Sequence, residues 1–451
     1  MIERPLAHIV LAVPHRFLSR VTALMLRTAL VCLAALITLV SSRLTLGQQL
    51  GEVLISQSTA ERHGLTRAWY AQIRLDGAIG RVTYVTLDRD VLFVQTSHAM
   101  LHAINAETGR TIWAQRVGQP RLLSMAPGAN NQYVTVINGS TLYLIDRRTG
   151  RLQWSREVNG IAGAGPAVSL TRVFVPMING MIEGYEIDKP KQHPWFYKSD
   201  GRILVQPMIT PRSVIWTTNK GHFYIGNADE VGVRLRLETR ASIEARPAYW
   251  MPYVYACSLD GNVYAIDETT GQTAWKFPTG DPISQPPVAI QDRVYAVSND
   301  GGMYQLNGKT GEQLWYAPGI THFISRSPSR VYANDGLNRL AILDDRTGTR
   351  LDSLPLGPIS LKIKNCDTDR IYLCTQGGQI QCLHELGLAK PVVYVPPAPP
   401  EVVASGDKGK KKDAPVKQPP ETKKKEPPKK EPPPKAEEKR PVEDDVANPF
   451  G

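Results

Sequence analysis

The chain has 451 residues and a formal net charge of +11, with 42% hydrophobic and 21% charged residues. Residues 1–47 carry +4 and residues 401–451 carry +2, which leaves +5 for the residues between them. So weak an excess over about 350 residues excludes nucleic acid as an expected partner, because that ligand requires concentrated positive charge. The length alone would allow two or three domains.

The N-terminal region pairs a basic leader with a short apolar run. Four arginines precede Thr28–Val40, which at 13 residues is shorter than the roughly 20 needed to span a bilayer. We predict that residues 1–47 form a signal peptide, cleaved after Gly47 or after Ser42, or else an uncleaved signal anchor. Val31 stands where a lipid attachment site at Cys32 would need a small residue, so no lipid anchor is predicted. Residues 48–64 form a short lead-in.

A repeated motif, T-G-x-x-x-W, dominates the rest of the chain. Gly109 and Gly150 lie 41 residues apart, Gly271 and Gly311 lie 40 apart, and the gap between the two pairs is 121, about three periods. The motif begins at Thr108, Thr149, Thr270 and Thr310. A period near 40 residues indicates a repeat architecture rather than several unrelated domains.

One repeat contains four short strands. Tyr253–Ser258 and Asn262–Asp267 flank Asp260-Gly261, a dipeptide typical of type I′ hairpin turns. Gln272–Phe277 is a third strand, and Ser284–Ile290 leads into the next repeat and supplies its first strand. Four antiparallel strands in about 40 residues are typical of one propeller blade.

Counting the central hairpins predicts eight blades. The hairpins cover Val91–Asn105, Tyr133–Asp146, Val173–Asp188, Val214–Asn227, Tyr253–Asp267, Val294–Asn307, Val331–Asp344 and Ile371–His384. We therefore predict an all-β fold, an eight-bladed β-propeller over residues 65–392. Three blades are irregular: the third has Lys189-Pro190 in place of Thr-Gly, the fourth lacks the motif, and the seventh has Asp352 where Trp would stand.

The ring needs a strand from the N-terminal end to close. Trp69 precedes Trp113 by 44 residues, so Ala68–Leu75 is an outer strand that belongs to no earlier blade. We predict that it completes the eighth blade and removes an open sheet edge. Lys390–Val395 is the competing candidate for this strand.

The recurring tryptophans and glycines are predicted to be structural. An indole can fill the wedge between two blades, and it removes about 150–250 Å² from water. The predicted blade-docking residues are Trp69, Trp113, Trp154, Trp195, Trp275 and Trp315. The predicted turn glycines are Gly109, Gly150, Gly271, Gly311 and Gly348.

No catalytic, cofactor or metal site is predicted. His98 and His102 flank a hairpin, where a spacing of four does not place two side chains on one face. The cysteines outside the leader are expected to be unpaired, buried and small. In blade eight, a turn at Gly377-Gly378 would pair Cys382 with Leu373 and point it away from Cys374.

The C-terminal region, from residue 393, has no apolar periodicity. It is rich in Pro, Lys and Glu, and we predict a disordered tail over residues 393–451. Within it, Lys408–Lys430 carries +7. This basic stretch is either a solvated spacer or a contact to an anionic wall polymer or membrane surface.

The segments LHAINAETGRTIWAQ, LYLIDRRTGRLQW, VYAIDETTGQTAWKF and MYQLNGKTGEQLWYA resemble the blade signature of PQQ-like (pyrroloquinoline quinone-like) β-propeller repeats. The resemblance covers about residues 65–390. It implies either a PQQ-dependent dehydrogenase or a non-enzymatic protein like outer-membrane assembly lipoprotein B. The dehydrogenase branch implies adjacent cysteines over the quinone, calcium ligands and a catalytic Asp on long loops, and no position of this sequence matches them.

We therefore expect an exported, non-catalytic scaffold, periplasmic or envelope-associated, without cofactor and monomeric. Its partners are expected to be proteins of the cell envelope. Two alternatives remain at this point. One is a PQQ-dependent oxidoreductase, and the other is a wall-associated protein that acts through its basic tail.

Overall fold

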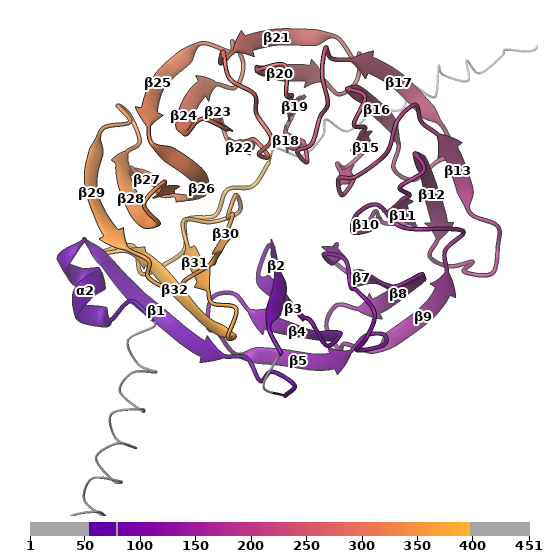
Figure 1. The fold of residues 1–451 in the computed structure, drawn as a ribbon, viewed down its shortest axis with the longest axis horizontal. Coiled ribbons are helices and arrows are strands. Elements are labelled where there is room, and N and C mark those ends of the chain that lie inside the picture. The colour runs from indigo at the N-terminus through magenta and orange to yellow at the C-terminus, as the bar shows by residue number, and fades with distance from the viewer. Residues whose placement is uncertain (1–53, 78–79, 397–451) are drawn as a thin grey trace, which may run out of the picture. The chain divides into compact units, whose positions relative to one another are not determined.

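The computed structural model describes residues 54–77 and 80–396. Within them, eight four-stranded antiparallel sheets stand radially around a common centre (Figure 1). The predicted eight-bladed propeller is therefore confirmed. The helix of the described residues is α2 (Gln57–Arg62), and none of their helices is long and apolar enough to cross a membrane.

In each blade the first strand lies nearest the centre of the ring and the fourth at the rim (Figure 1). In blades one to four the strands are β2 (Val82–Asp88), β3 (Val91–Thr96), β4 (Met100–Asn105), β5 (Thr111–Arg116), β6 (Gly128–Ala129), β7 (Tyr133–Asn138), β8 (Thr141–Asp146), β9 (Leu152–Glu157), β10 (Ala167–Val168), β11 (Arg172–Pro176), β12 (Met181–Glu186), β13 (Trp195–Lys198), β14 (Met208–Ile209), β15 (Ser213–Thr217), β16 (His222–Asn227) and β17 (Val233–Glu238). In blades five to eight they are β18 (Ala248–Trp250), β19 (Tyr253–Cys257), β20 (Asn262–Asp267), β21 (Thr273–Pro278), β22 (Val288–Ile290), β23 (Arg293–Ser298), β24 (Gly302–Asn307), β25 (Gln313–Pro318), β26 (Ile320–Arg326), β27 (Arg330–Asp335), β28 (Arg339–Asp344), β29 (Arg350–Pro355), β30 (Leu361–Ile363), β31 (Ile371–Cys374), β32 (Gln379–Glu385) and β1 (Leu65–Gln72).

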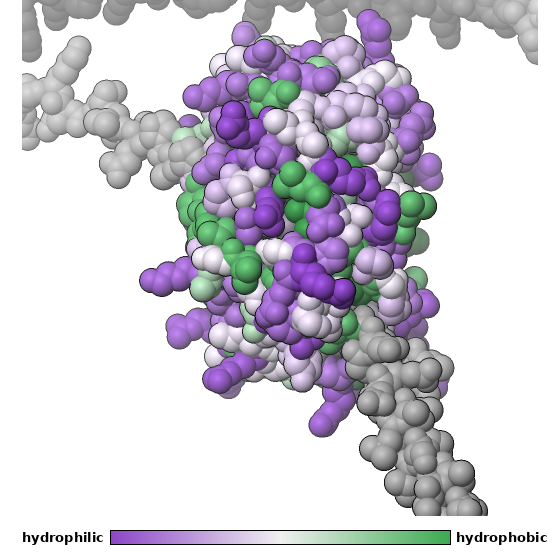
Figure 2. All heavy atoms as spheres, turned by 90° about the vertical axis from the view of Figure 1, so that its left-hand side faces the viewer, coloured by the Kyte–Doolittle hydropathy of each residue, from purple (hydrophilic) through white to green (hydrophobic). Residues whose placement is uncertain are grey.

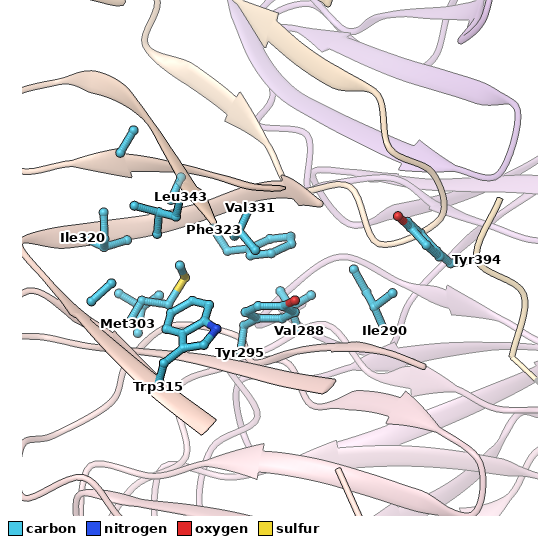
Figure 3. Close-up of a cluster of buried hydrophobic side chains, with 14 residues drawn as sticks. Val288, Ile290, Tyr295, Met303, Trp315, Ile320, Phe323, Val331, Leu343 and Tyr394 are labelled. Carbon is cyan, nitrogen blue, oxygen red and sulfur yellow. The ribbon is translucent and has the colours of Figure 1, made fainter. Parts of the chain in front are cut away.

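Burial follows the position of a strand within its blade. The second strand of blade one, β3, is buried at every residue, because both faces of the sheet pack on neighbouring blades. The rim strand β17 alternates half-buried and exposed residues, since only one of its faces meets a neighbour. The core is accordingly divided into clusters that lie between blades, such as the one in Figure 3, which joins blades six and seven.

The N-terminal strand closes the ring, as predicted. β1 pairs with β32 in antiparallel register, with Leu65 opposite Glu385 and Trp69 opposite Cys382. The strand begins three residues earlier than the predicted Ala68–Leu75 and ends at Gln72. The competing segment Lys390–Val395 forms no rim strand. Val393 instead forms an isolated antiparallel bridge with Thr368, which lies between β30 and β31 of blade eight.

The turn at Asp260-Gly261 differs from the predicted type. Gly261 has φ of 75°, whereas Asp260 is not among the residues with positive φ. A type I′ turn needs positive φ at both central residues, so that prediction was wrong. Gly261 N–H instead donates to Ser258 O at 3.1 Å, and the glycine follows the turn in the left-handed region.

The cysteine register of blade eight was also predicted wrongly. Cys382 pairs with Tyr372, and Cys374 pairs with Ile380. The loop holds Gln376–Gly378 rather than two glycines, which shifts the register by one residue and puts both thiols on one face of the sheet. The prediction that the cysteines are unpaired is confirmed for the four in the described residues.

The predicted signal region, residues 1–47, and nearly all of the predicted tail lie outside the described residues. The domain boundaries at residues 47, 64 and 392 therefore stay predictions. The described part of the lead-in contains α2, whose Ser56 caps the helix by accepting the Thr59 N–H.

Candidate functional site

Five of the six predicted indoles reach from their own blade into the next. Their Nε1–H groups donate to backbone carbonyls of the following blade at 2.8–3.0 Å. The pairs are Trp69 with Ala106, Trp113 with Arg147, Trp154 with Ile187, Trp275 with Gly308 and Trp315 with Asp345. Trp195 has no such bond among the described residues, and its ring packs edge-on against Phe174.

The turn glycines lie directly under these rings. A Cβ placed on Gly109, Gly150, Gly311 or Gly348 would come within 2.5–2.7 Å of the indole of the preceding blade. All four have φ between 69° and 75°, where a side chain is strained even in open space. These contacts are what blade docking requires, and the docking role itself stays a prediction.

In the irregular fourth blade, a leucine takes the place that an indole has in the regular blades. Gly271 of blade five lies under Leu235 rather than under an indole, with a Cβ distance of 2.6 Å to Leu235 Cδ1. Sequence reasoning missed Leu235 because a lone Leu in an alternating strand has no distinguishing pattern.

In each Thr-Gly turn, an Asp or Asn side chain accepts a hydrogen bond from the N–H of the Thr. Sequence reasoning also missed this role. Asp146 Oδ1 accepts the N–H of Thr149 at 2.8 Å and its hydroxyl at 2.7 Å. The Thr149 hydroxyl is the largest cause of the lowered pKa of Asp146. The sequence did contain the signal, because Asn or Asp precedes Thr by three residues in every regular copy of the motif.

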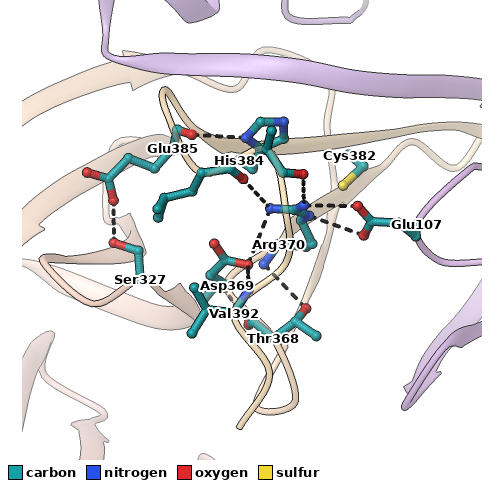
Figure 4. A network of polar contacts seen from close by, with 12 residues as sticks. Glu107, Ser327, Thr368, Asp369, Arg370, Cys382, His384, Glu385 and Val392 are labelled. Carbon is teal, nitrogen blue, oxygen red and sulfur yellow. Dashed lines mark hydrogen bonds and ion pairs between the residues drawn. The ribbon is translucent and has the colours of Figure 1, made fainter.

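The seam between blades eight and one is joined by a buried arginine (Figure 4). Arg370 is fully buried, and its Nε and one terminal nitrogen donate to the two carboxylate oxygens of Glu107 at 3.2 and 2.9 Å. It also contacts Asp369 and the carbonyls of Leu388 and Ala389. Burial by itself lowers the pKa of Arg370, but the hydrogen bonds to Glu107 and the charges of both carboxylates outweigh it and raise that pKa.

The seam between blades seven and eight lacks an indole, and the lead-in occupies it. Asp352, which stands where Trp was expected, pairs with His63 Nδ1 at 2.6 Å. Ile55 and Ala60, from α2 and the residues before it, are buried in the same cluster as Leu340 of blade seven. The lead-in therefore contributes to the core at this seam.

The C-terminal end of the described chain packs against blades six, seven and eight. Tyr394 is buried in the cluster of blades six and seven, beside Ile290 (Figure 3), and its hydroxyl donates to Arg326 O at 3.1 Å. A cavity of about 720 Å³ lies between this segment and the turns of blade one, lined among others by Asp88, Glu107 and Tyr372. Residues of the segment 391–396 thus form one wall of this cavity.

His98 and His102, the two histidines considered as metal ligands, are not grouped with other side chains that could bind a metal ion. His102 is buried, its Nε2 has no partner within the described part of the chain, and burial lowers its pKa. His98 Nδ1 lies 3.3 Å from the Ser97 hydroxyl. Across residues 54–77 and 80–396 there is no group of three or more His, Cys, Asp or Glu side chains placed to hold a metal ion.

Exposed hydrophobic side chains gather on the face of the propeller that lies away from the segment 391–396. They belong to the turns between second and third strands, and to the connections between blades, in blades two to four. We call Leu122, Leu123, Ile161, Ile178 and Leu204 the apolar patch, in which Leu123 is 85% and Ile161 72% exposed. The rim seen in Figure 2, by contrast, is mostly polar with separate small hydrophobic groups.

Fold and surfaces together define a class of protein, an eight-bladed propeller of PQQ-like repeats. A family model described as outer membrane protein assembly factor BamB matches residues 48–182 and 212–360, and the chain belongs to this family. The predicted resemblance is thereby confirmed. Residues 183–211, between the two matched segments, hold the rim strand of blade three and the start of blade four, where the motif is irregular.

Individual relatives are distant. A protein of Moranella endobia (strain PCIT), outer membrane protein assembly factor BamB, is 22% identical over 222 residues, which is 43% of this chain and 57% of that protein. The crystal structure of BamB from Moraxella catarrhalis has a TM-score of 0.58 at 19% identity and covers 71% of this chain and 97% of that one. The computationally designed Ika8 protein has a TM-score of 0.54 at 15% identity, covering 69% and 98%. At these identities the solved structures are similar in fold alone.

Proposed function

We propose that this protein is a non-catalytic scaffold of the cell envelope that binds protein partners of the outer membrane assembly machinery. Membership of the BamB family supports this role, because the relatives are named as assembly factors. The observation that carries the proposal is the apolar patch. Exposed hydrophobic side chains that gather on one face mark an interaction site when they form a large patch, whereas singly scattered ones do not.

The patch residues stand on turns and connections of three successive blades, two to four. Ile178 N–H donates to Ile161 O at 2.9 Å, which holds the turn of blade three against the connection that precedes it. Gly139 N–H donates to Leu123 O at 2.9 Å in blade two. These backbone hydrogen bonds fix the turns and connections that carry the patch residues. A partner would therefore meet a preorganised surface, which lowers the entropy cost of binding.

The proposal is tested with the double variant Leu123→Lys/Ile161→Lys and the purified outer membrane assembly complex. We expect affinity to fall by about tenfold or more, because two exposed apolar anchors become charged. The matched control is Leu170→Lys/Leu386→Lys, which charges two residues that are 62% and 60% exposed on the opposite face. Equal loss in both variants, or none in either, would contradict the assigned surface.

The enzymatic alternative gives a distinct outcome. Stoichiometric bound-quinone absorbance after mixing the protein with PQQ and calcium would overturn the non-catalytic role. Monomeric state and a contact of Lys408–Lys430 with an anionic polymer stay predictions, and those lysines lie outside the described residues.

A further inference from the structure

A second cavity opens at the seam between blades five and six. It has a volume of about 670 Å³ and lies on the face that carries the segment 391–396, since Val395 is part of its lining. Blade five lines it with the rings of Trp250, Pro252, Tyr253 and Tyr255. Figure 1 shows the end of the described chain beside β18, the strand that ends at Trp250. We call this space the aromatic cavity.

Two hydrogen-bond donors at the aromatic cavity are free. Six of the eight tryptophans donate their Nε1–H to a protein oxygen, but Trp250 has no such partner in residues 54–77 and 80–396. The Tyr253 hydroxyl has none there either, whereas the Tyr255 hydroxyl donates to Gly308 O at 3.0 Å. Trp250 and Tyr253 are half-buried and neither donor atom is enclosed, so both can meet a ligand.

Aromatic rings that carry free N–H and O–H groups are suited to a proline-rich segment. Such a segment adopts polyproline II, which has no internal hydrogen bonds and therefore presents its carbonyl oxygens to a donor. Its proline rings pack in aromatic-lined grooves, and its conformation is formed before binding, which reduces the entropy cost. Trp and Tyr fit this task because one part of each side chain is apolar and the other polar.

The sequence that follows Val395 supplies a segment of this kind. Residues 396–401 read Pro-Pro-Ala-Pro-Pro-Glu, in which the P-x-x-P spacing occurs twice. The chain is fixed just before it, because Tyr394 is buried and its N–H donates to Asp367 O at 2.8 Å. In polyproline II, at about 3.1 Å per residue, Pro400 would lie about 16 Å from Val395. The prolines are therefore held at high effective concentration beside the cavity.

We propose that residues 396–400 of this chain dock in the aromatic cavity as a polyproline II segment. The Trp250 Nε1–H and the Tyr253 hydroxyl would donate to backbone carbonyls of the segment. Lys309 of blade six also lines the cavity, is exposed and has no ion pair within the described residues, so it would attract the carboxylate of Glu401. This docking does not depend on the apolar patch or on its partner.

The first test uses fluorine NMR of the full-length protein labelled with 5-fluorotryptophan, in which Trp250→Phe assigns the Trp250 resonance. The triple variant Pro397→Gly/Pro399→Gly/Pro400→Gly removes the rings and the preformed conformation, and it changes no residue of the described propeller. We expect the Trp250 resonance to move and the other seven to stay in place. The matched control, Pro427→Gly/Pro428→Gly/Pro432→Gly, alters the same number of prolines farther along and should move none.

The second test titrates the free peptide Pro-Pro-Ala-Pro-Pro-Glu. It should bind the triple variant saturably and return the Trp250 resonance to its wild-type position. Binding to the wild type should be at least about tenfold weaker, because the tethered segment competes. Adding Tyr253→Phe to the triple variant should weaken peptide binding about fivefold through loss of one hydrogen bond. Tyr316→Phe, at an exposed tyrosine on the rim of blade six, is its matched control and should leave that binding unchanged.

Two results would overturn the proposal. If the triple variant leaves the Trp250 resonance in place, residues 396–400 do not occupy the cavity. If the free peptide binds the wild type and the triple variant equally, the cavity is open in the wild type and serves a proline-rich segment of another protein instead. Equal effects of Tyr253→Phe and Tyr316→Phe would remove the Tyr253 hydroxyl from the site.

Discussion

Replacing Arg370 with Met will lower the free energy of unfolding by about 3 kcal/mol, the lower end of the range for breaking a buried ion pair, because Glu107 is partly exposed. The substitution leaves Asp369 buried with one fewer partner and leaves the carbonyls of Leu388 and Ala389 without their donor. Urea denaturation followed by tryptophan fluorescence measures the change.

The matched control is Arg346→Met, since Arg346 is exposed beside the Thr-Gly turn of blade seven. We expect that change to stay within about 0.5 kcal/mol of the wild type. If Arg370→Met were equally mild, the seam between blades eight and one would be held by strand pairing and apolar packing alone.

Gly311→Ala will destabilise the protein by about 2–4 kcal/mol. Two costs combine at this position. A non-glycine residue at φ of 75° costs about 1 kcal/mol, and overpacking against a ring costs about 1–3 kcal/mol. The added Cβ would lie 2.6 Å from the indole of Trp275, whose Nε1 is held by the carbonyl of Gly308. Thermal or chemical unfolding measures the loss.

Gly319→Ala separates these two costs. Gly319 has φ of 72°, but nothing lies within 4 Å of a Cβ built there. We expect a loss of about 1 kcal/mol from backbone strain alone. Combining Gly311→Ala with Trp275→Leu should then cost less than the sum of the two single changes, because the clash is removed. Equal losses at Gly311 and Gly319 would show that the indole does not dock on the glycine.

The blade number and the mode of closure were predictable from the sequence because both follow from periodicity. A period of 40 or 41 residues, together with alternating hairpins, leaves a propeller as the simplest fold. Trp69 marked the closing strand since it stands one period before Trp113. The exact register of blade eight was not predictable, because the loop length at Gln376–Gly378 depends on local turn geometry.

The binding surfaces were not predictable because they are made by residues far apart in the chain. Arg370 of blade eight, for example, meets Glu107 of blade one, which lies 263 positions away in the chain. The apolar patch joins Leu123, Ile161 and Leu204 from three repeats, each of which has an ordinary exposed residue when considered alone.

The sequence by itself determined the repeat, its four strands and the indoles and glycines that recur with it, since these depend on local spacing and turn conformation. Only the tertiary structure decided which charges lack partners, which hydrophobic residues face solvent and how the lead-in covers the seam without an indole. The physical reason is that periodicity specifies each blade separately, whereas burial and charge pairing depend on how the closed ring brings different blades together.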